Sequence, residues 1–228
     1  MKRLVQLVLV IALAFGLAVQ AGAALIEGFE SGNLNNYTFG NTFAVTTGAA
    51  HNDTYGLEAY SQGWAYRNDS GAQVAQGDVL SVWIRFSGSA DARAYFGFGA
   101  SSAGTLSFVL APNTGDILFQ ENSGYTTYTQ LNASPQSFLA DHWYRAQVDW
   151  GIGGNLTGRL YDSDGTTLLN TVNSFSNLYT SGGIAFRGFG ATKEFDTVTT
   201  GAVPLPASLL LFGPGLVGLA AAKRRFRK

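Results

Sequence analysis

The chain has 228 residues, of which 46% are hydrophobic and 13% are charged, and it contains no cysteine. The lack of cysteine excludes disulfides, thiolate catalysis and thiolate metal sites, so a packed core must provide the stability. Seven of the 14 Lys and Arg residues lie in the two end segments and none of the 15 Asp and Glu residues does, so residues 24–201 carry a net charge of −8, which argues against nucleic-acid binding.

The segment Met1–Ala23 has the pattern of a secretory signal peptide. Lys2 and Arg3 form its positive start, and the residues that follow as far as Val19 are apolar apart from one glutamine. Ala21-Gly22-Ala23 provides the small residues of a cleavage site. The sequence therefore predicts export, with the mature body beginning near Ala24. An uncleaved N-terminal anchor is the alternative.

The body, residues 24–201, has no long helical periodicity. It consists of short runs rich in aromatic and β-branched residues, separated by Gly, Asn, Asp and Ser, which is typical of an all-β domain. So many strands in one domain predict two stacked antiparallel sheets. The expected strands are Leu25–Phe29, Phe43–Thr47, Gly56–Tyr60, Gly63–Asn68, Asp78–Phe86, Ala92–Gly99, Thr105–Ala111, Asp116–Gln120, Thr126–Leu131, His142–Asp149, Leu156–Asp162, Thr167–Val172, Gly183–Phe189 and Glu194–Thr199.

Two of these runs indicate which side of a strand is buried. Every second residue from Leu80 to Phe86 is apolar, and the same holds from Tyr144 to Trp150. We expect these sides to pack against the opposing sheet. The other sides of both runs carry tryptophan and arginine.

The outward tryptophan and arginine side chains suggest a carbohydrate-binding face. Flat aromatic rings stack on sugar rings, and arginine and carboxylate groups hydrogen-bond sugar hydroxyls. The alternative is that the two tryptophans are core residues and the arginines are solvated strand partners. The candidate face contains Trp83, Arg85, Tyr95, Trp143, Arg145, Asp149, Arg159, Tyr161 and Arg187, of which Trp83, Arg85, Trp143, Arg145, Asp149 and Arg187 are the predicted glycan contacts.

The terminal runs of the body suggest a second site. Glu30 follows the first expected strand and Asp196 lies in the last, and the terminal strands of a jelly roll often pair at one edge. Hard oxygen ligands brought together there would suit a structural Ca²⁺. Exposed carboxylates at strand ends are the alternative. Asp162-Ser163-Asp164-Gly165 also begins like a calcium loop, but it lacks the downstream Glu, so we expect a hairpin turn there.

The body resembles a concanavalin A-like (laminin G-like) jelly roll. The resemblance depends on Phe29-Glu30-Ser31-Gly32, on the run Val79–Phe86, on His142-Trp143-Tyr144-Arg145 and on Phe195-Asp196-Thr197-Val198. A galactose-binding-like jelly roll shares the opening Phe-Glu and the closing Phe-Asp and is the alternative fold. Glycosidases of this architecture carry a Glu-x-Asp-x-Glu strand, which is missing here. The sequence thus predicts a non-catalytic body, for which the structural Ca²⁺ is the one candidate cofactor, with a polysaccharide hydrolase or lyase as the alternative.

The C-terminal segment Ala202–Lys228 has three parts. Val203-Pro204-Leu205-Pro206 comes first, the uncharged apolar run Ala207–Ala222 follows, and a basic cluster that begins with Lys223, Arg224 and Arg225 ends the chain. This pattern predicts a membrane-spanning helix with its positive end in the cytoplasm. A plain membrane anchor and a buried helix of the domain are the alternatives.

The same segment resembles the PEP-CTERM sorting signal of exopolysaccharide-producing Gram-negative bacteria. Val203, Pro204 and Pro206 match its motif, and Leu205 replaces the usual Glu. The resemblance implies transient residence in the inner membrane and recognition by an exosortase-type membrane peptidase. It also implies removal of the tail and delivery of the body to the cell surface or extracellular matrix, where exopolysaccharide is a plausible partner.

Overall fold

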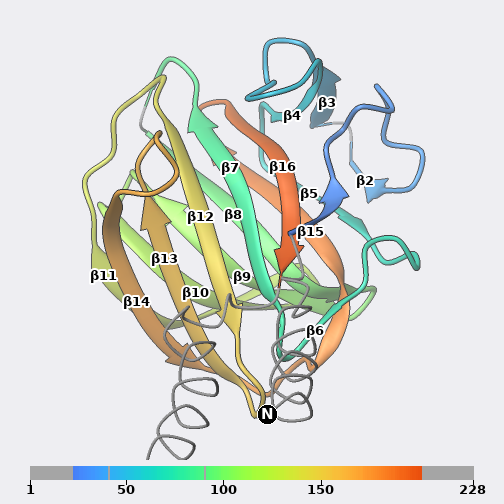
Figure 1. The fold of residues 1–228 in the computed structure, drawn as a ribbon, viewed down its shortest axis with the longest axis vertical. Coiled ribbons are helices and arrows are strands. Elements are labelled where there is room, and N and C mark those ends of the chain that lie inside the picture. Colours follow the sequence, from blue (N-terminus) through green and yellow to red (C-terminus); the bar gives the residue numbers. More distant parts are fainter. Residues whose placement is uncertain (1–22, 41, 90, 202–228) are drawn as a thin grey trace, which may run out of the picture. The chain divides into compact units, whose positions relative to one another are not determined.

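The computed structural model describes residues 23–40, 42–89 and 91–201, and every regular element in these ranges is a β-strand. These strands form two antiparallel sheets that pack face to face, with one sheet in front of the other in Figure 1. The all-β two-sheet sandwich expected from the sequence is therefore confirmed. The predicted signal peptide and sorting segment lie outside the described residues.

We name each sheet after a central strand. In the β7 sheet the order is β14 (Leu168–Phe175), β13 (Asn155–Tyr161), β12 (Trp143–Trp150), β7 (Val79–Phe86), β16 (Lys193–Gly201), β4 (Gly56–Ala59) and β3 (Phe43–Thr46), and β1 (Ala24–Glu27) also pairs with β16. In the β8 sheet the order is β11 (Thr127–Pro135), β10 (Asp116–Ser123), β9 (Gly104–Ala111), β8 (Ala92–Ser101), β15 (Ser181–Gly190), β5 (Gly63–Arg67) and β2 (Thr38–Phe39), and β6 (Val74–Ala75) also pairs with β15.

Each of the expected strands coincides with an observed one, and the differences lie at the ends. The structure adds β2 and β6, two residues each, which are too short to show alternation. Among the described residues there is no helix long and apolar enough to cross a membrane.

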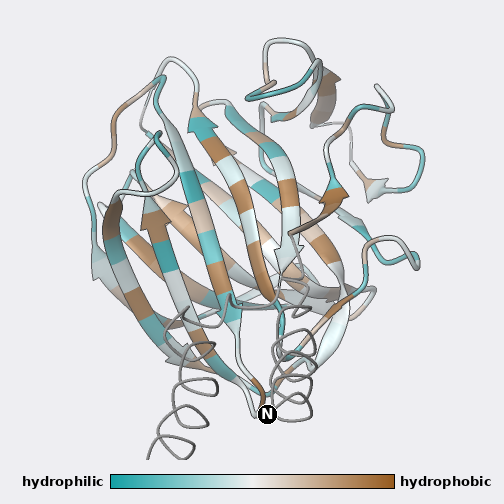
Figure 2. Cartoon of the chain, viewed as in Figure 1, coloured by the Kyte–Doolittle hydropathy of each residue, from teal (hydrophilic) through white to brown (hydrophobic). Residues whose placement is uncertain are grey.

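The core is formed by the alternate apolar residues of both sheets. In β7 and β12 every second residue is buried, and Figure 2 shows the hydropathy alternating along both strands. The buried side chains include Leu80, Ile84 and Trp150, as the alternation predicts. The two sheets meet through aromatic contacts such as that of Trp150 with Phe98 of β8, whose ring centroids are 5.1 Å apart.

The last strand, β16, changes partner halfway along. Its first residues pair with β4, and Val198 to Thr200 pair with β1, so the terminal strands meet as the sequence predicts. The register with β7 shifts between Asp196 and Thr199, and Thr197 has a φ of 50°, so the strand carries a bulge there. The bulge directs the buried Asp196 carboxylate at the loop between β3 and β4.

Candidate functional site

Five of the predicted glycan contacts share the outer side of the β7 sheet. Trp83 and Arg85 come from β7, and Trp143, Arg145 and Asp149 come from the neighbouring β12. The register pairs Trp143 with Arg85 and Arg145 with Trp83, and all five side chains are half-buried. Sequence alternation therefore placed these residues together correctly. Their interactions decide whether they are available to a ligand.

The arginines on this face already have partners within the protein. Arg85 forms an ion pair with Glu194, donates to the Gly48 carbonyl at 2.7 Å, and lies 4.9 Å from the Trp143 ring centroid. Arg145 donates to the Gly165 carbonyl at 2.8 Å and lies over the Tyr161 ring.

The remaining polar groups of this face continue the same network. Arg159 pairs with Asp149, whose other oxygen accepts a hydrogen bond from Gln147 at 3.0 Å. The Arg159–Asp149 pair cross-links β13 and β12, whereas the bond between Gln147 and Asp149 lies within β12.

Trp83 is covered as well. The ring of His51, from the β3–β4 loop, stacks on it with centroids 3.9 Å apart and 19° between the planes. Burial lowers the pKa of His51, and the Asp196 carboxylate opposes that effect while Arg85 adds to it. The Trp83 ring also lies close to Gly165 in the hairpin turn between β13 and β14. The face predicted from the sequence is thus largely occupied by the protein's own side chains.

The structure separates Arg187 from the other predicted contacts. Arg187 lies in β15 and Tyr95 lies in β8, so both belong to the β8 sheet and not to the sheet that carries Trp83. The single face that we expected from the sequence is therefore two faces on opposite sides of the sandwich. Alternation showed correctly that these side chains point outward, but it does not show which sheet a strand joins.

The outer side of the β8 sheet presents a row of six cross-strand neighbours. The register aligns Trp64 with Arg187, Arg187 with Tyr95, and Tyr95 with Val109, and the row continues through β10 to β11. Unlike an ordinary solvent-facing row, its middle is buried: Tyr95 is 3% exposed and Arg187 is 4% exposed. The complete row is Trp64, Arg187, Tyr95, Val109, Leu118 and Ala133.

The hairpin between β10 and β11 provides part of the cover. Tyr125, at the turn with a φ of 61°, stacks on Tyr66 and lies 5.0 Å from the Trp64 ring centroid. Its hydroxyl donates to the Ser101 carbonyl at 2.8 Å, and burial raises its pKa. Tyr128, in the next strand, donates to the Tyr125 carbonyl at 2.9 Å. The hairpin is thus fixed against the sheet by aromatic contacts at one end of the row.

Arg187 lies among aromatic rings. Its guanidinium carbon is 4.5 Å from the Tyr95 ring centroid, 4.6 Å from that of Tyr128 and 5.7 Å from that of Trp64. The π electrons of these rings attract a cation. The Nε of Arg187 is buried and has no hydrogen-bond partner, and the Nε1 of Trp64 is in the same condition.

A hollow of about 330 Å³ opens beside these residues. Tyr128 and Phe189, which both line it, are 41% and 40% exposed, so their rings are accessible to a ligand. Arg93 also lines the hollow, with its Nε donating to Asn113 at 2.8 Å. No acidic side chain or histidine is among the lining residues, which are Arg93, Tyr95, Asn113, Gln120, Tyr128, Arg187 and Phe189.

The floor next to the hollow carries a chain of buried polar groups. Ser107 donates to the Asn122 Oδ1 at 2.6 Å, and the Asn122 Nδ2 donates to the Gln120 Oε1 at 2.9 Å. This chain fixes the Gln120 amide and leaves its nitrogen free of any hydrogen bond to the described residues. Rings, amides and guanidinium groups thus line one hollow, a combination that can stack on a sugar and bond its polar groups.

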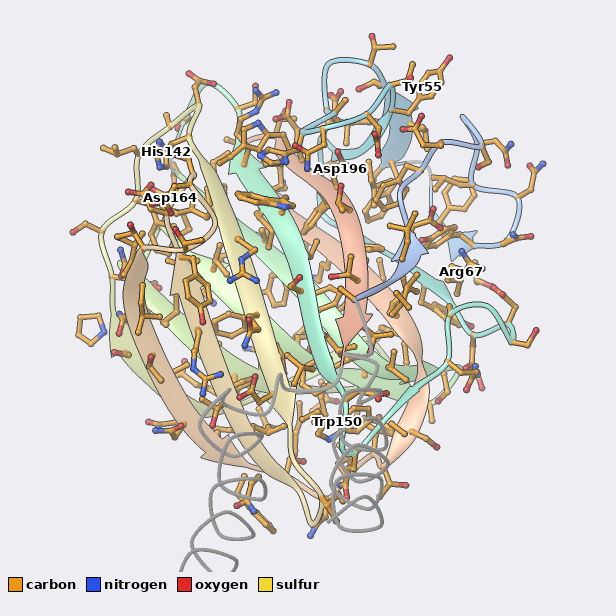
Figure 3. The ribbon with its side chains drawn as sticks, in the orientation of Figure 1. Tyr55, Arg67, His142, Trp150, Asp164 and Asp196 are labelled. Atoms are coloured by element: carbon orange, nitrogen blue, oxygen red, sulfur yellow. The ribbon has the colours of Figure 1, made fainter. Side chains whose placement is uncertain are left out.

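Glu30 and Asp196, the predicted calcium pair, both bind the backbone of the β3–β4 loop. Glu30 accepts hydrogen bonds from the amides of Thr54 and Tyr55, and Asp196 accepts from the amide of His51 at 2.7 Å. Burial raises the pKa of Asp196, although these amide donors oppose that effect. Figure 3 shows Asp196 and Tyr55 at the same end of the sandwich. In the ranges that the structure covers, no three His, Cys, Asp or Glu side chains gather as metal ligands.

The other expected calcium-like segment is a hairpin turn. Asp162 accepts a backbone hydrogen bond from Gly165 at 2.8 Å, and Gly165 has a φ of 69°. The Asp164 carboxylate accepts from the amides of Thr166 and Thr167, so its oxygens close the turn that joins β13 and β14.

Sequence reasoning identified two members of the hollow, Tyr95 and Arg187, but attached them to the wrong sheet. It missed Tyr128, Phe189 and Gln120 altogether. Phe189 lies two positions after Arg187 in the same strand, and this spacing indicates that both side chains point to the same side of the sheet. No comparable signal exists for the hairpin, because its fold-back depends on the turn conformation at Tyr125.

Comparisons with known proteins identify the fold. No family model and no curated protein matches the chain. Among solved structures, the carbohydrate-binding module CBM66 from Bacillus subtilis is similar with a TM-score of 0.54 at 12% identity, over 80% of this chain and 97% of that one. A galectin-like protein of unknown function, also from Bacillus subtilis, has a TM-score of 0.55 at 8% identity, over 74% of this chain and 90% of that one.

A third similar structure is the exoplasmic/lumenal domain of VIP36 in a form with Ca²⁺ and Man3GlcNAc bound. Its TM-score is 0.50 at 12% identity, over 76% of this chain and 86% of that one. At such identities these likenesses establish a shared jelly-roll sandwich and nothing finer.

Proposed function

We propose that this chain is an exported cell-surface or extracellular-matrix protein whose β-sandwich binds glycans without breaking them down. The observation that carries the proposal is the hollow on the outer side of the β8 sheet, where accessible rings of Tyr128 and Phe189 flank amide and guanidinium donors. Sugars present apolar faces and rims of hydroxyls, so a site of this composition offers both the stacking and the hydrogen bonds that they need.

Two further observations support a glycan ligand over other small molecules. The hollow is open at the surface of a sheet, which suits a unit within a long polymer. Two of the similar structures are a carbohydrate-binding module and a domain bound to Man3GlcNAc. These two structures support the proposal only in that a sandwich of this fold can carry a carbohydrate-binding site.

Binding is favoured over catalysis because of what lines the hollow. Hydrolysis of a glycosidic bond normally uses two carboxyl groups, one as acid and one as base or nucleophile. None of the residues that line this hollow is Asp or Glu. A bound polysaccharide should therefore be recovered at its original length.

The glycan-binding proposal is tested on the full chain, kept in a detergent whose headgroup is not a sugar. Binding to a panel of polysaccharides is measured for the unaltered protein and for Tyr128→Ala and Phe189→Ala. Each substitution removes a half-exposed ring, so we expect binding to weaken about tenfold, a loss typical of one aromatic contact. The lengths of the recovered polysaccharides are measured in the same samples.

The matched control is Phe175→Ala, which removes an exposed ring from β14 on the β7 sheet. It should leave binding unchanged. If it weakens binding while Tyr128→Ala does not, the binding face is on the other sheet. Binding to no polysaccharide, or shortening of the polymer, would refute the proposal.

Export and sorting form the second part of the proposal. The signal-peptide pattern of Met1–Ala23 and the three-part C-terminal segment support passage through the inner membrane and processing by an exosortase-type membrane peptidase. The test is fractionation of cells that express the full chain or a chain ending at Ala202. Delivery of both chains to the surface in equal amounts would refute sorting through Val203–Lys228.

A further inference from the structure

Arg187 differs from the other arginines that the structure describes. Arg67, Arg85 and Arg159 each pair with a carboxylate, Arg145 donates to a backbone carbonyl, and Arg93 donates to an amide. Arg187 is 96% buried and forms no hydrogen bond or ion pair with any described residue. Burying an unpaired charge is costly, so the position calls for an explanation.

The surroundings of Arg187 recover only part of that cost. Three rings surround the guanidinium, and attraction between a cation and an aromatic ring is weaker than a hydrogen-bonded ion pair. Arg187 lines the hollow, and Nε is the one of its nitrogens that is enclosed without a partner, so its terminal N–H groups are the ones open to a molecule that enters. The group that would satisfy this fork best is an anion with two oxygens in one plane.

A second buried cation lies behind the hollow, on the inner side of the same strand β15. Lys193, in β16, is fully buried, and its Nζ donates only to the Gly190 carbonyl at 3.1 Å. Its side chain passes directly against Gly188, next to Arg187 in β15. Burial lowers the pKa of Lys193 to about 8, and repulsion by Arg187 adds to the effect. Neither cation pairs with an acidic side chain among the described residues.

We propose that the hollow binds a carboxylate-bearing sugar, a hexuronate unit of an acidic polysaccharide, and that Arg187 pairs with its carboxylate. This inference rests on the proposed glycan-binding function and specifies the class of ligand. Tyr128 or Phe189 stacks on the sugar ring, and Gln120 and Asn113 bond its hydroxyls. Arg93, which has only neutral partners among the described residues, contributes a second positive charge to the lining.

The charge of the rest of the body sets the mode of binding. Residues 24–201 carry a net charge of −8, so a polyanion is repelled overall and is attracted only at the hollow. Recognition should therefore involve one enclosed ion pair and not a broad basic patch. Since enclosed pairs are screened less than exposed ones, we expect the affinity to change little with salt.

The experiment compares acidic polymers with their own neutral derivatives. Polygalacturonate, polymannuronate and polyglucuronate are each used with the neutral polymer made from it by reduction of the carboxyl groups. Binding to the full chain is measured in detergent without a sugar headgroup. For at least one pair we expect the acidic member to bind about 30-fold more tightly, the gain of a charge-assisted, partly enclosed contact.

Substitutions assign this preference to Arg187. Arg187→Gln should abolish the difference between the acidic and neutral members while leaving neutral binding in place, and Arg187→Lys should retain part of it because the charge remains without the fork. Tyr128→Ala should weaken both members equally. If Arg187→Gln does not fold, the preference of the unaltered protein and the rise of the Lys193 pKa on ligand binding, measured by NMR, still decide the question.

The possible outcomes separate this inference from the proposed function. Equal binding of acidic and neutral polymers refutes the uronate assignment and leaves glycan binding intact. Binding of dextran sulfate as tightly as any uronate, with dextran not bound, refutes the choice of a carboxylate. An unchanged Lys193 pKa in a saturated acidic complex also contradicts it. Binding of none of the polymers refutes the glycan-binding function itself.

Discussion

The ring of His51 stacks on the indole of Trp83 with centroids 3.9 Å apart, and it makes a T-shaped contact with Trp143, whose ring centroid is 4.9 Å away. His51 belongs to a loop, whereas both tryptophans belong to the central strands of the β7 sheet. The loop therefore closes a surface that would otherwise expose two large rings. This contact is the main reason why the β7 sheet, despite its tryptophans and arginines, is not the face that we assign to a ligand.

The His51 contact makes folding stability depend on pH. Burial lowers the pKa of His51 in the folded protein, so the unfolded chain binds more protons between that pKa and about 6.5. The free energy of unfolding should thus decrease as the pH falls below about 6.5. His51→Gln should remove this part of the pH dependence in chemical denaturation measured between about pH 5 and pH 8.

His142→Gln is the control for His51→Gln: it removes the chain's other histidine, which contacts Asp162 at 2.6 Å and not Trp83, so the part of the pH dependence assigned to His51 should remain. Tryptophan fluorescence in the folded state gives an independent measurement, because His51→Ala uncovers Trp83 and should shift its emission to longer wavelength. An emission spectrum identical to that of the unaltered protein would mean that the loop does not cover Trp83 in solution.

The sequence determined the sandwich and its faces more fully than the site. Alternation of apolar residues identified the buried sides of β7 and β12, and the pairing of β1 with β16 was expected because the terminal strands of a jelly roll often pair at one edge. Local alternation is sufficient there because a strand of period two has only two sides.

The candidate site required information that local patterns do not contain. Arg187 and Trp83 both read as outward residues, but only the order of strands in each sheet reveals that they lie on opposite surfaces. Likewise, Tyr125 covers the β8 sheet because of a left-handed turn residue and contacts with Trp64 and Tyr66, which are about 60 residues away in the sequence. The absence of an ion-pair partner for Arg187 among the described residues can likewise be seen only in the three-dimensional structure.

Lys193 should destabilise the fold while it is charged. Its pKa is about 8 in the folded protein and near 10.5 in the unfolded chain, so between these values the unfolded chain binds one proton more. The free energy of unfolding should accordingly rise with pH across this window, by up to about 1.4 kcal/mol per pH unit. Lys193→Met keeps the apolar volume and should abolish the slope.

Denaturation curves of the unaltered protein and Lys193→Met between about pH 7.5 and pH 10.5 test this expectation. Lys193→Met should also be more stable than the unaltered protein at the lower end of that range, where the buried ammonium is present. A stability that falls with rising pH in both proteins by the same amount would show that Lys193 titrates normally.

Asp196 should be essential for the β3–β4 loop. Its carboxylate accepts hydrogen bonds from the amides of His51, Asn52 and Thr197 in a fully buried position. Asp196→Ala leaves buried donors without a partner, so we expect a loss of about 2–4 kcal/mol in the free energy of unfolding. Limited proteolysis should also cut the loop between residues 48 and 55 faster than in the unaltered protein.

Asp53→Ala provides the control, because Asp53 is exposed in the same loop and makes none of these contacts. It should change neither stability nor the rate of cleavage. Equal cleavage rates for Asp196→Ala and Asp53→Ala would contradict the anchoring role of the buried carboxylate.

Gly158 is required for the two sheets to approach each other. It lies on the inner side of β13, and a Cβ atom added there would lie 2.6 Å from the Cε2 of Phe108 in β9. Phe108 is fully buried and packs against Phe119 with ring centroids 5.2 Å apart, so it has little room to move.

Gly158→Ala should lower the free energy of unfolding by about 1–3 kcal/mol, the usual cost of overpacking a core. Gly40→Ala, at a position with no neighbouring atom within 4 Å, should have no such effect. Gly158→Ala should cost less stability in a Phe108→Leu background than in the unaltered protein, since the smaller leucine accommodates the added methyl group. Strictly additive losses in this double-mutant cycle would mean that the two residues are not in contact.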